Sequence, residues 1–294
     1  MANLKEIRNR ITSVSATEQV TSAMKMVAAA KLKKTQDAII KISPYANKLH
    51  EILTSLSDDE QIIKENIYFQ QKPAKNILIV FVSSNRGLCG AFNSGVIKRG
   101  FETAQKKYPE QLASGNVTFI AIGKYAHDFL RKNHLNITRR FGHVFDDLTY
   151  ENVVPIAQYL MNGFVNGYFD KIDLIYNRFK NAAVQILSVE QFLPIEPRIN
   201  KKEEKSIEQE FIFEPTKKYI VNELIPKSLK IQLYKALLDS YASEHGARMT
   251  AMHKATDNAN NLIRDLRIEY NKARQASITN EILEIVSGAD ALSK

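Results

Sequence analysis

The stretch YKALLDSYASEHGARMTAMHKATDNANNLIRDL, from Tyr234 to Leu266, decides the fold because apolar and small residues recur in it every three and four positions. This alternation places the recurring side chains on one face of a helix, as in the seam of a coiled coil. Ala273 continues the pattern, and no proline interrupts residues 227–294. We therefore predict a long C-terminal helix over residues 217–294. Its seam positions are Tyr234, Leu238, Tyr241, His245, Arg248, Met252, Ala255, Ala259, Leu262 and Leu266.

The N-terminal part of the chain carries a matching helical pattern. Residues 1–86 contain no glycine, and Pro44 is predicted to kink the helix or end its straight part. Because the two helical segments lie at opposite ends of the chain, we predict that residues 1–70 and 217–294 form an antiparallel two-helix coiled coil. The N-terminal seam runs through Leu4, Ile7, Ile11 and Val14 and then shifts, as in a stutter, to Val20, Met24, Val27 and Leu32.

The middle of the chain, residues 71–216, has a different pattern. Short apolar runs rich in β-branched residues alternate there with helix-like segments, which predicts an inserted Rossmann-like α/β domain with a largely parallel sheet. Residues 194–216, rich in proline and charge, are predicted to be a mobile loop or linker. The predicted strands are 76–82, 117–122, 171–177 and 184–193, and the predicted helices lie near 91–108, 124–133 and 151–169.

Composition and charge limit the class of protein. The 294 residues carry a net charge of +9, and the excess lies in residues 1–50 and 217–294. A basic surface of this kind suits anionic partners such as nucleic acid, a membrane surface or an acidic protein. No apolar run approaches the ~20 residues of a membrane helix, and no secretory signal is visible at the N-terminus. Cys89 is the only cysteine, so an internal disulfide framework is excluded and a reducing, cytoplasmic location is expected.

The stretch SSNRGLCGAFNSG, Ser83–Gly95, is the strongest candidate for chemistry, because it follows the apolar run ILIVFV. Glycine-flanked turns after strands hold nucleophiles and phosphate groups in α/β enzymes. However, the spacing fits neither a P-loop nor a dinucleotide fingerprint, and no histidine is placed to activate Cys89. We expect a tight turn in which Gly87 and Gly90 have positive φ and Leu88 tucks in beside Cys89. We expect no catalytic residue, no cofactor and no metal ion.

Two functional hypotheses rest on the residues alone. One is a coiled-coil scaffold or nucleic-acid-binding protein with an inserted globular head. The other is an enzyme that uses Cys89.

Several segments resemble one known family, the γ subunits of rotary F-type ATP synthases. The resemblance covers the chain from end to end and is weakest in the middle. It is carried by KEIRNRITSV (5–14), AMKMVAAAKL (23–32), SSNRGLCGAFN (83–93), ASEHGARMTAMHKATDNANNLI (242–263) and YNKARQASITNEILEIVSGADAL (270–292).

The resemblance implies a central rotor shaft that couples proton-driven rotation of the c-ring to conformational change in a catalytic hexamer of α and β subunits. The hexamer would carry the nucleotide sites, and this chain would be a non-catalytic subunit. The α/β domain would contact the c-ring and the ε subunit, and no nucleic acid would bind. The chain would lie at the cytoplasmic face of a bacterial inner membrane, peripherally and only through the complex.

The resemblance also implies roles for five residues. Arg274, Gln275 and Thr279 match the positions at which the shaft contacts the hexamer, which is the stator. Met24 and Arg248 match shaft positions that couple transport to catalysis.

Overall fold

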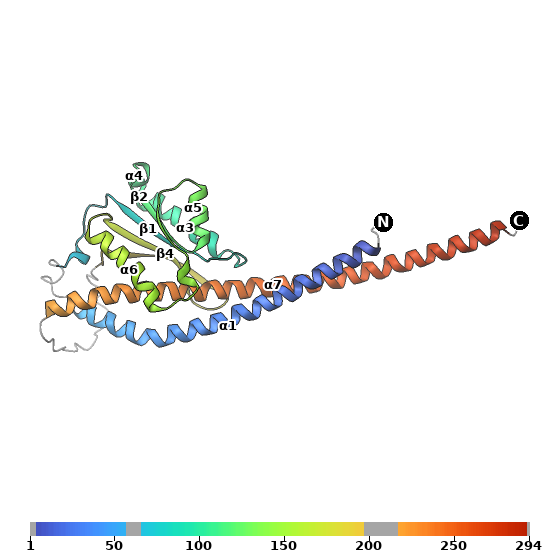
Figure 1. The fold of residues 1–294 in the computed structure, drawn as a ribbon, viewed down its shortest axis with the longest axis horizontal. Helices are drawn as coiled ribbons and strands as arrows, with labels where there is room; N and C mark the ends of the chain where they lie inside the picture. The colour runs from blue at the N-terminus through green and yellow to red at the C-terminus, as the bar shows by residue number, and fades with distance from the viewer. Residues whose placement is uncertain (1–3, 57–65, 197–216, 293–294) are drawn as a thin grey trace. The chain divides into compact units, whose positions relative to one another are not determined.

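The computed structural model describes residues 4–56, 66–196 and 217–292. Helix α1 (Leu4–Leu56) and helix α7 (Lys217–Leu292) flank an α/β domain in the chain (Figure 1). The predicted fold class, a two-helix coiled coil with an inserted α/β domain, is confirmed.

The chain divides into two compact units, and both long helices contribute to each of them. We call Met1–Ala29 with Arg248–Lys294 the two-helix unit, and Ala30–Ala247 the α/β unit. The predicted division into residues 1–70, 71–216 and 217–294 stays a prediction. The proposed linker lies outside the described residues from position 197 onward.

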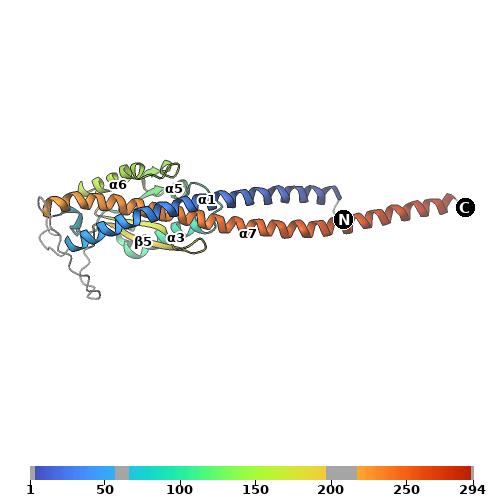
Figure 2. The same cartoon turned by 90° about the horizontal axis from the view of Figure 1, so that it is seen from below.

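In the two-helix unit, α1 and α7 run antiparallel and lie side by side in both views (Figures 1 and 2). The hydroxyl oxygens of Thr21 and Thr256 are 2.9 Å apart, which fixes the register of the pair. Ala28 and Ala259 are buried, and such small side chains let helix backbones approach closely. Larger buried residues close the seam at Ile7, Met252 and Leu266.

The predicted stutter in the N-terminal seam is wrong. Val20 and Val27 are 58% and 57% exposed, whereas Thr21 is half-buried and Ala28 is buried. The stripe therefore continues from Val14 in steps of seven through Thr21 and Ala28. The sequence pattern placed the stripe on Val20 because valine is apolar and Thr21 is polar. The Thr21 hydroxyl is accommodated in the seam because Thr256 supplies a hydrogen-bonding partner.

Helix α1 continues through Pro44 to Leu56, so the proline does not end the helix, and the expected kink stays a prediction. Proline removes the N–H that would bond the carbonyl four residues earlier. Pro44 is exposed, so water can reach the carbonyl that loses its partner. The hydroxyl of Ser43 also donates to the Ile39 carbonyl at 2.7 Å, which adds a bond in the same turn.

A five-stranded sheet with the order β3-β2-β1-β4-β5 forms the centre of the α/β unit. The first four strands are parallel, and β5 runs antiparallel to β4, so a largely parallel sheet was predicted correctly. Only β3, with the sequence ITRRF, was not predicted, because it is a mostly exposed edge strand without an apolar run. The strands are β1 (Ile77–Val82), β2 (Val117–Ile122), β3 (Ile137–Phe141), β4 (Lys171–Phe179) and β5 (Gln185–Leu193).

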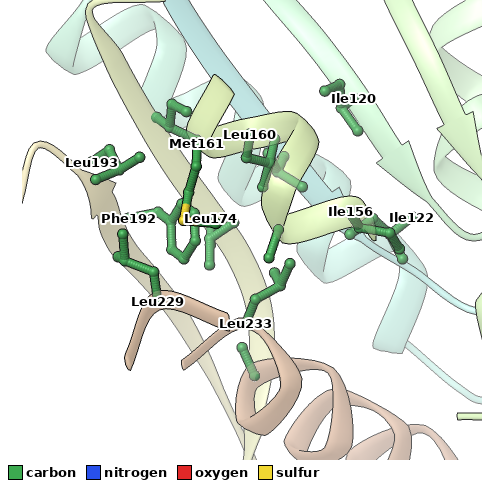
Figure 3. Packing of buried hydrophobic residues seen from close by; sticks show 14 of the residues in the cluster. Ile120, Ile122, Ile156, Leu160, Met161, Leu174, Phe192, Leu193, Leu229 and Leu233 are labelled. Carbon is green, nitrogen blue, oxygen red and sulfur yellow. The ribbon is translucent and has the colours of Figure 1, made fainter. Parts of the chain in front are cut away.

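Helices cover both faces of the sheet, which explains why all six residues of β1 are buried. Helices α3 (Phe92–Lys107) and α5 (Lys124–Lys132) pack on one face. On the other face lie α6 (Tyr150–Val165) and the part of α7 around Leu229 and Leu233 (Figure 3). The remaining short elements are η1 (Ile67–Phe69), α4 (Pro109–Ala113) and η2 (His143–Phe145). None of the helices in the described part of the chain is both long enough and apolar enough to span a membrane.

Candidate functional site

The turn after β1 lies at the carboxyl edge of the sheet, where related α/β folds bind phosphate groups at helix N-termini. In this protein, residues of the turn itself bind the N-terminus of α5, the helix that faces the turn. The first three backbone N–H groups of α5 donate to Asn85 Oδ1 (3.0 Å), the Ser84 carbonyl (3.1 Å) and Ser83 Oγ (3.0 Å). These donors are therefore engaged within the protein, which argues against an anion site at this helix end.

Cys89 is buried beneath the same turn, with a relative exposure of 1%. Its sulfur lies 3.2 Å from Asn93 Nδ2, 3.8 Å from Ser84 Oγ and 3.9 Å from the Arg86 carbonyl. An amide, a hydroxyl and a carbonyl are not bases that could take the thiol proton. The surroundings of Cys89 are those of a packed structural cysteine.

The backbone of the turn differs in part from the expectation. Gly90 has the predicted positive φ (60°), but the other left-handed residue is Leu88 (φ 62°), and not Gly87. The side chain of Leu88 is 66% exposed, so it does not tuck in beside Cys89. The left-handed backbone turns this side chain outward while Cys89 enters the core.

For the ATP synthase that the resemblance implies, we predict that Cys89→Ala leaves the ATP turnover of the assembled complex within about twofold of the wild-type rate, because truncating a packed thiol removes little volume and no base. Steady-state ATP hydrolysis by purified complex checks this. Complete assembly with a rate lower by orders of magnitude would show that the thiol takes part in catalysis.

Two acidic residues of the α/β unit, Asp170 and Asp173, also have structural roles. Asp170 Oδ2 accepts backbone N–H bonds from Lys75 (3.1 Å) and Asn76 (2.8 Å). Asp173 is fully buried, and its Oδ2 accepts from the Tyr108 hydroxyl at 2.9 Å and lies 3.6 Å from Lys107 Nζ. Among the residues that the structure describes, no group of three or more His, Cys, Asp or Glu side chains could hold a metal ion.

The three predicted stator-contact residues lie together near the end of α7. Arg274, Gln275 and Thr279 are exposed, and the hydroxyl of Thr279 donates to the Gln275 carbonyl at 2.9 Å. Counted from the Thr21–Thr256 contact towards the C-terminus of α7, Leu4 of α1 and Ala273 of α7 are the same number of residues away, so they lie about level. The three side chains are therefore carried by α7 beyond its pairing with the described part of α1 (Figure 1).

The structure places the two predicted coupling residues elsewhere in the two-helix unit. Met24 is half-buried on α1, and Arg248 is 7% exposed on α7. Both lie on the same side of the Thr21–Thr256 contact, about one and two helical turns from it, so the structure brings them near each other along the axis. Arg274 lies about 39 Å beyond Arg248 along α7, at 1.5 Å per residue. The five residues therefore form two separate groups.

A set of exposed apolar residues beyond Arg274 was not identified from the sequence. These side chains are between 46% and 70% exposed and recur at helical spacing, without a matching stripe on α1. Contiguous exposed apolar surface of this kind marks a contact with another protein. Their helical spacing is the feature of the sequence that could have revealed them. The residues are Ile278, Ile282, Leu283, Ile285 and Val286.

Comparison with known proteins identifies the family. The ATP synthase family model matches residues 3–292. The ATP synthase gamma chain of Flavobacterium johnsoniae is 57% identical over 293 residues, which cover 100% of both chains. This chain belongs to the ATP synthase gamma chain family. The gamma chain of Cytophaga hutchinsonii is 46% identical over 294 residues, again with 100% coverage of both chains.

Solved structures share the gamma-chain fold. In the Euglena gracilis mitochondrial ATP synthase (OSCP/F1/c-ring, rotational state 3), one chain is 21% identical with a TM-score of 0.70. The match covers 98% of this chain and 94% of that one. In the central stalk and c-ring of the Tetrahymena thermophila mitochondrial ATP synthase, a chain is 22% identical with a TM-score of 0.60. That match covers 80% of this chain and 99% of the other.

Proposed function

We propose that this chain is the central rotor shaft of an F-type ATP synthase and couples rotation of the c-ring to conformational change at the catalytic subunits. The observation that carries the proposal is the match to gamma chains along the full length of the chain, with 57% identity to that of Flavobacterium johnsoniae. That match does not favour a scaffold or nucleic-acid-binding protein.

The geometry supports a role by contact and not by chemistry. The exposed end of α7 offers apolar side chains, with the cation Arg274 beside them, to a surrounding protein. We propose that α and β subunits form this socket and carry the nucleotide sites, so that the gamma chain itself is non-catalytic. The ε subunit and the c-ring are the proposed partners of the α/β unit.

We propose that the chain lies at the cytoplasmic face of a bacterial inner membrane, held there only by the complex. The gamma chains of Flavobacterium johnsoniae and Cytophaga hutchinsonii, which match it along their full length, come from bacteria. A gamma chain that stays with the hexamer when the membrane sector is stripped away would support this peripheral placement.

Arg274, Gln275 and Thr279 are proposed as hydrogen-bonding contacts with the hexamer, and Met24 and Arg248 as coupling positions. Arg274 offers a rigid fork of five donors that suits a carboxylate, whereas Gln275 and Thr279 offer neutral donors. A charged hydrogen bond of this kind is worth more than a neutral one, so Arg274 is expected to contribute most.

We predict that Arg274→Ala lowers the ATP turnover of the assembled complex roughly tenfold, the equivalent of one charge-assisted hydrogen bond. Arg267, seven residues earlier on the same helix and also exposed, is the matched control, and Arg267→Ala is expected to keep the wild-type rate. Equal rates for both variants in complexes of normal composition would remove Arg274 from the proposed contact.

The proposed function is tested by the composition of the native complex. The tagged chain is purified from its own cells in mild detergent, and the native mass of the complex is recorded. One copy of this chain with three copies each of two nucleotide-binding subunits is the expected result. Recovery of the chain alone, or with nucleic acid, would contradict the proposal.

A further inference from the structure

Helix α7 presents a polar stripe to the β4–β5 hairpin within the α/β unit. The stripe consists of Gln232, Asp239, Ser243 and Gly246, which follow one another in steps of seven, four and three residues. Such steps return to the same face of a helix. Asp239 and Ser243 are buried, although polar side chains usually lie at the surface.

Glu190 of β5 joins three elements through one carboxylate. Its Oε2 accepts the Tyr176 hydroxyl of β4 at 2.8 Å, and its Oε1 accepts Nε2 of Gln232 of α7 at 2.6 Å. Burial and the neighbouring Glu190 raise the pKa of Tyr176, so its hydroxyl keeps the donated proton. Through this one carboxylate, α7 is tied to both strands.

Two more contacts hold α7 against the hairpin one to two turns beyond Asp239. The hydroxyl of Ser243, which is fully buried, donates to the Asn177 carbonyl of β4 at 3.0 Å. At Gly246 the helix approaches the hairpin turn so closely that a Cβ atom would lie 3.1 Å from the Ala182 carbonyl oxygen. The helix is therefore held at a set distance and at a set rotation about its own axis.

Apolar packing alone does not fix this geometry. Leu229 and Leu233 (Figure 3), together with Leu237, bury α7 against the sheet. The hydrophobic effect has no direction, however, and tolerates a small rotation or slide of the helix. Hydrogen bonds are directional and are lost when the helix turns by a few tens of degrees.

We propose that this polar stripe is the contact that transmits torque between the β4–β5 hairpin and α7. The proposal rests on the proposed function as a rotor, because only a rotor must carry torque through this contact. The Gln232–Glu190 bond and the Ser243 bond resist rotation of α7 about its axis, while the leucines supply adhesion without direction.

The test uses the assembled complex in membrane vesicles and compares ATP-driven proton pumping with ATP hydrolysis. In the variant Gln232→Met/Ser243→Ala, α7 loses two hydrogen bonds while its size and apolar face are nearly kept. Each lost bond favours, roughly fivefold, an arrangement in which α7 has rotated or slid against the hairpin. The expected result is a complex that hydrolyses ATP but pumps, per ATP hydrolysed, about half as many protons as wild type or fewer.

Thr103→Val is the matched control. Thr103 is a buried hydroxyl in the same unit, but it donates within its own helix, to the Arg99 carbonyl at 2.8 Å. This variant is expected to keep the wild-type ratio of pumping to hydrolysis. A purely structural role of the stripe would lower the yield of complex and leave that ratio unchanged.

The outcomes separate this proposal from the proposed function. Normal pumping with the wild-type chain and an unchanged ratio in the double variant would overturn the torque contact alone. No hexamer on the wild-type chain would overturn the proposed function and the torque contact together. If the double variant does not assemble, the single variant Ser243→Ala decides by the same ratio.

Discussion

Gly123→Ala is expected to destabilise the α/β unit by about 3 kcal/mol or more, a large effect for the addition of one methyl group. Gly123 has φ 105° and ψ 155°, a conformation that is essentially restricted to glycine. An added Cβ atom would lie 2.1 Å from the carbonyl oxygen of Ser83. Because the obstacle is backbone, no side-chain rotation relieves the contact, and the ends of β1 and β2 must separate.

The effect is measured as the free energy of unfolding in urea, followed by near-ultraviolet circular dichroism of the tyrosines. Gly115→Ala is the matched control, since Gly115 also has positive φ (74°) but a Cβ atom there would meet nothing within 4 Å. The control should cost only the backbone penalty, about 1–2 kcal/mol. Equal losses in both variants would show that the contact with Ser83 is not what Gly123 protects.

Asp239→Asn is expected to stabilise the α/β unit at about pH 8 by about 3 kcal/mol and to have little effect at about pH 4. Asp239 is 8% exposed. Burial raises the pKa of Asp239 to about 6, although Lys235 and Arg178 oppose the shift, and the nearby Glu190 adds to it. The folded chain therefore binds this proton more tightly than the unfolded chain does.

The sign of the pH dependence follows from that difference. The stability contributed by the proton is complete below the ordinary pKa of 3.8 and is lost as the pH rises through about 6. Asparagine resembles the protonated form at every pH, so the variant should lack this loss. Urea unfolding at the two pH values measures it.

Asp265→Asn provides the control for charge removal, because Asp265 is on the same helix but exposed to water. It should leave the difference between the two pH values as in the wild-type chain. The same pH dependence in Asp239→Asn and in wild type would show that the carboxylate of Asp239 is better solvated than its burial indicates.

The long helices and four of the five strands could be predicted because each is encoded locally. The spacing from Tyr234 to Leu266 repeats with the helical period, and runs such as ILIVFV are apolar on both faces, as a covered parallel strand requires. The turn in the stretch Ser83–Gly95 was also predicted correctly, because residues 83–91 join β1 to α3. Strand β3 was missed because an exposed edge strand has no apolar face to show.

Contacts between distant residues could not be predicted in this way. The seam passes through Thr21 and not Val20 because Thr256, far away in the chain, supplies a partner for its hydroxyl. The helical pattern of Gln232 and Ser243 showed only two polar residues on a helix. Their role depends on Glu190 and on the Asn177 carbonyl, which β4 and β5 bring to that face.

The sequence by itself therefore determined the long helices, four of the five strands, their order and the family resemblance, because periodicity and motifs are properties of neighbouring residues. Only the tertiary structure decided which polar side chains are satisfied inside and which apolar ones stay exposed. Ile282 and Leu266 look alike in the sequence, yet one is exposed and the other is buried. The physical reason is that a side chain is buried only where a second surface covers it, and the sequence of one helix describes only one of the two surfaces.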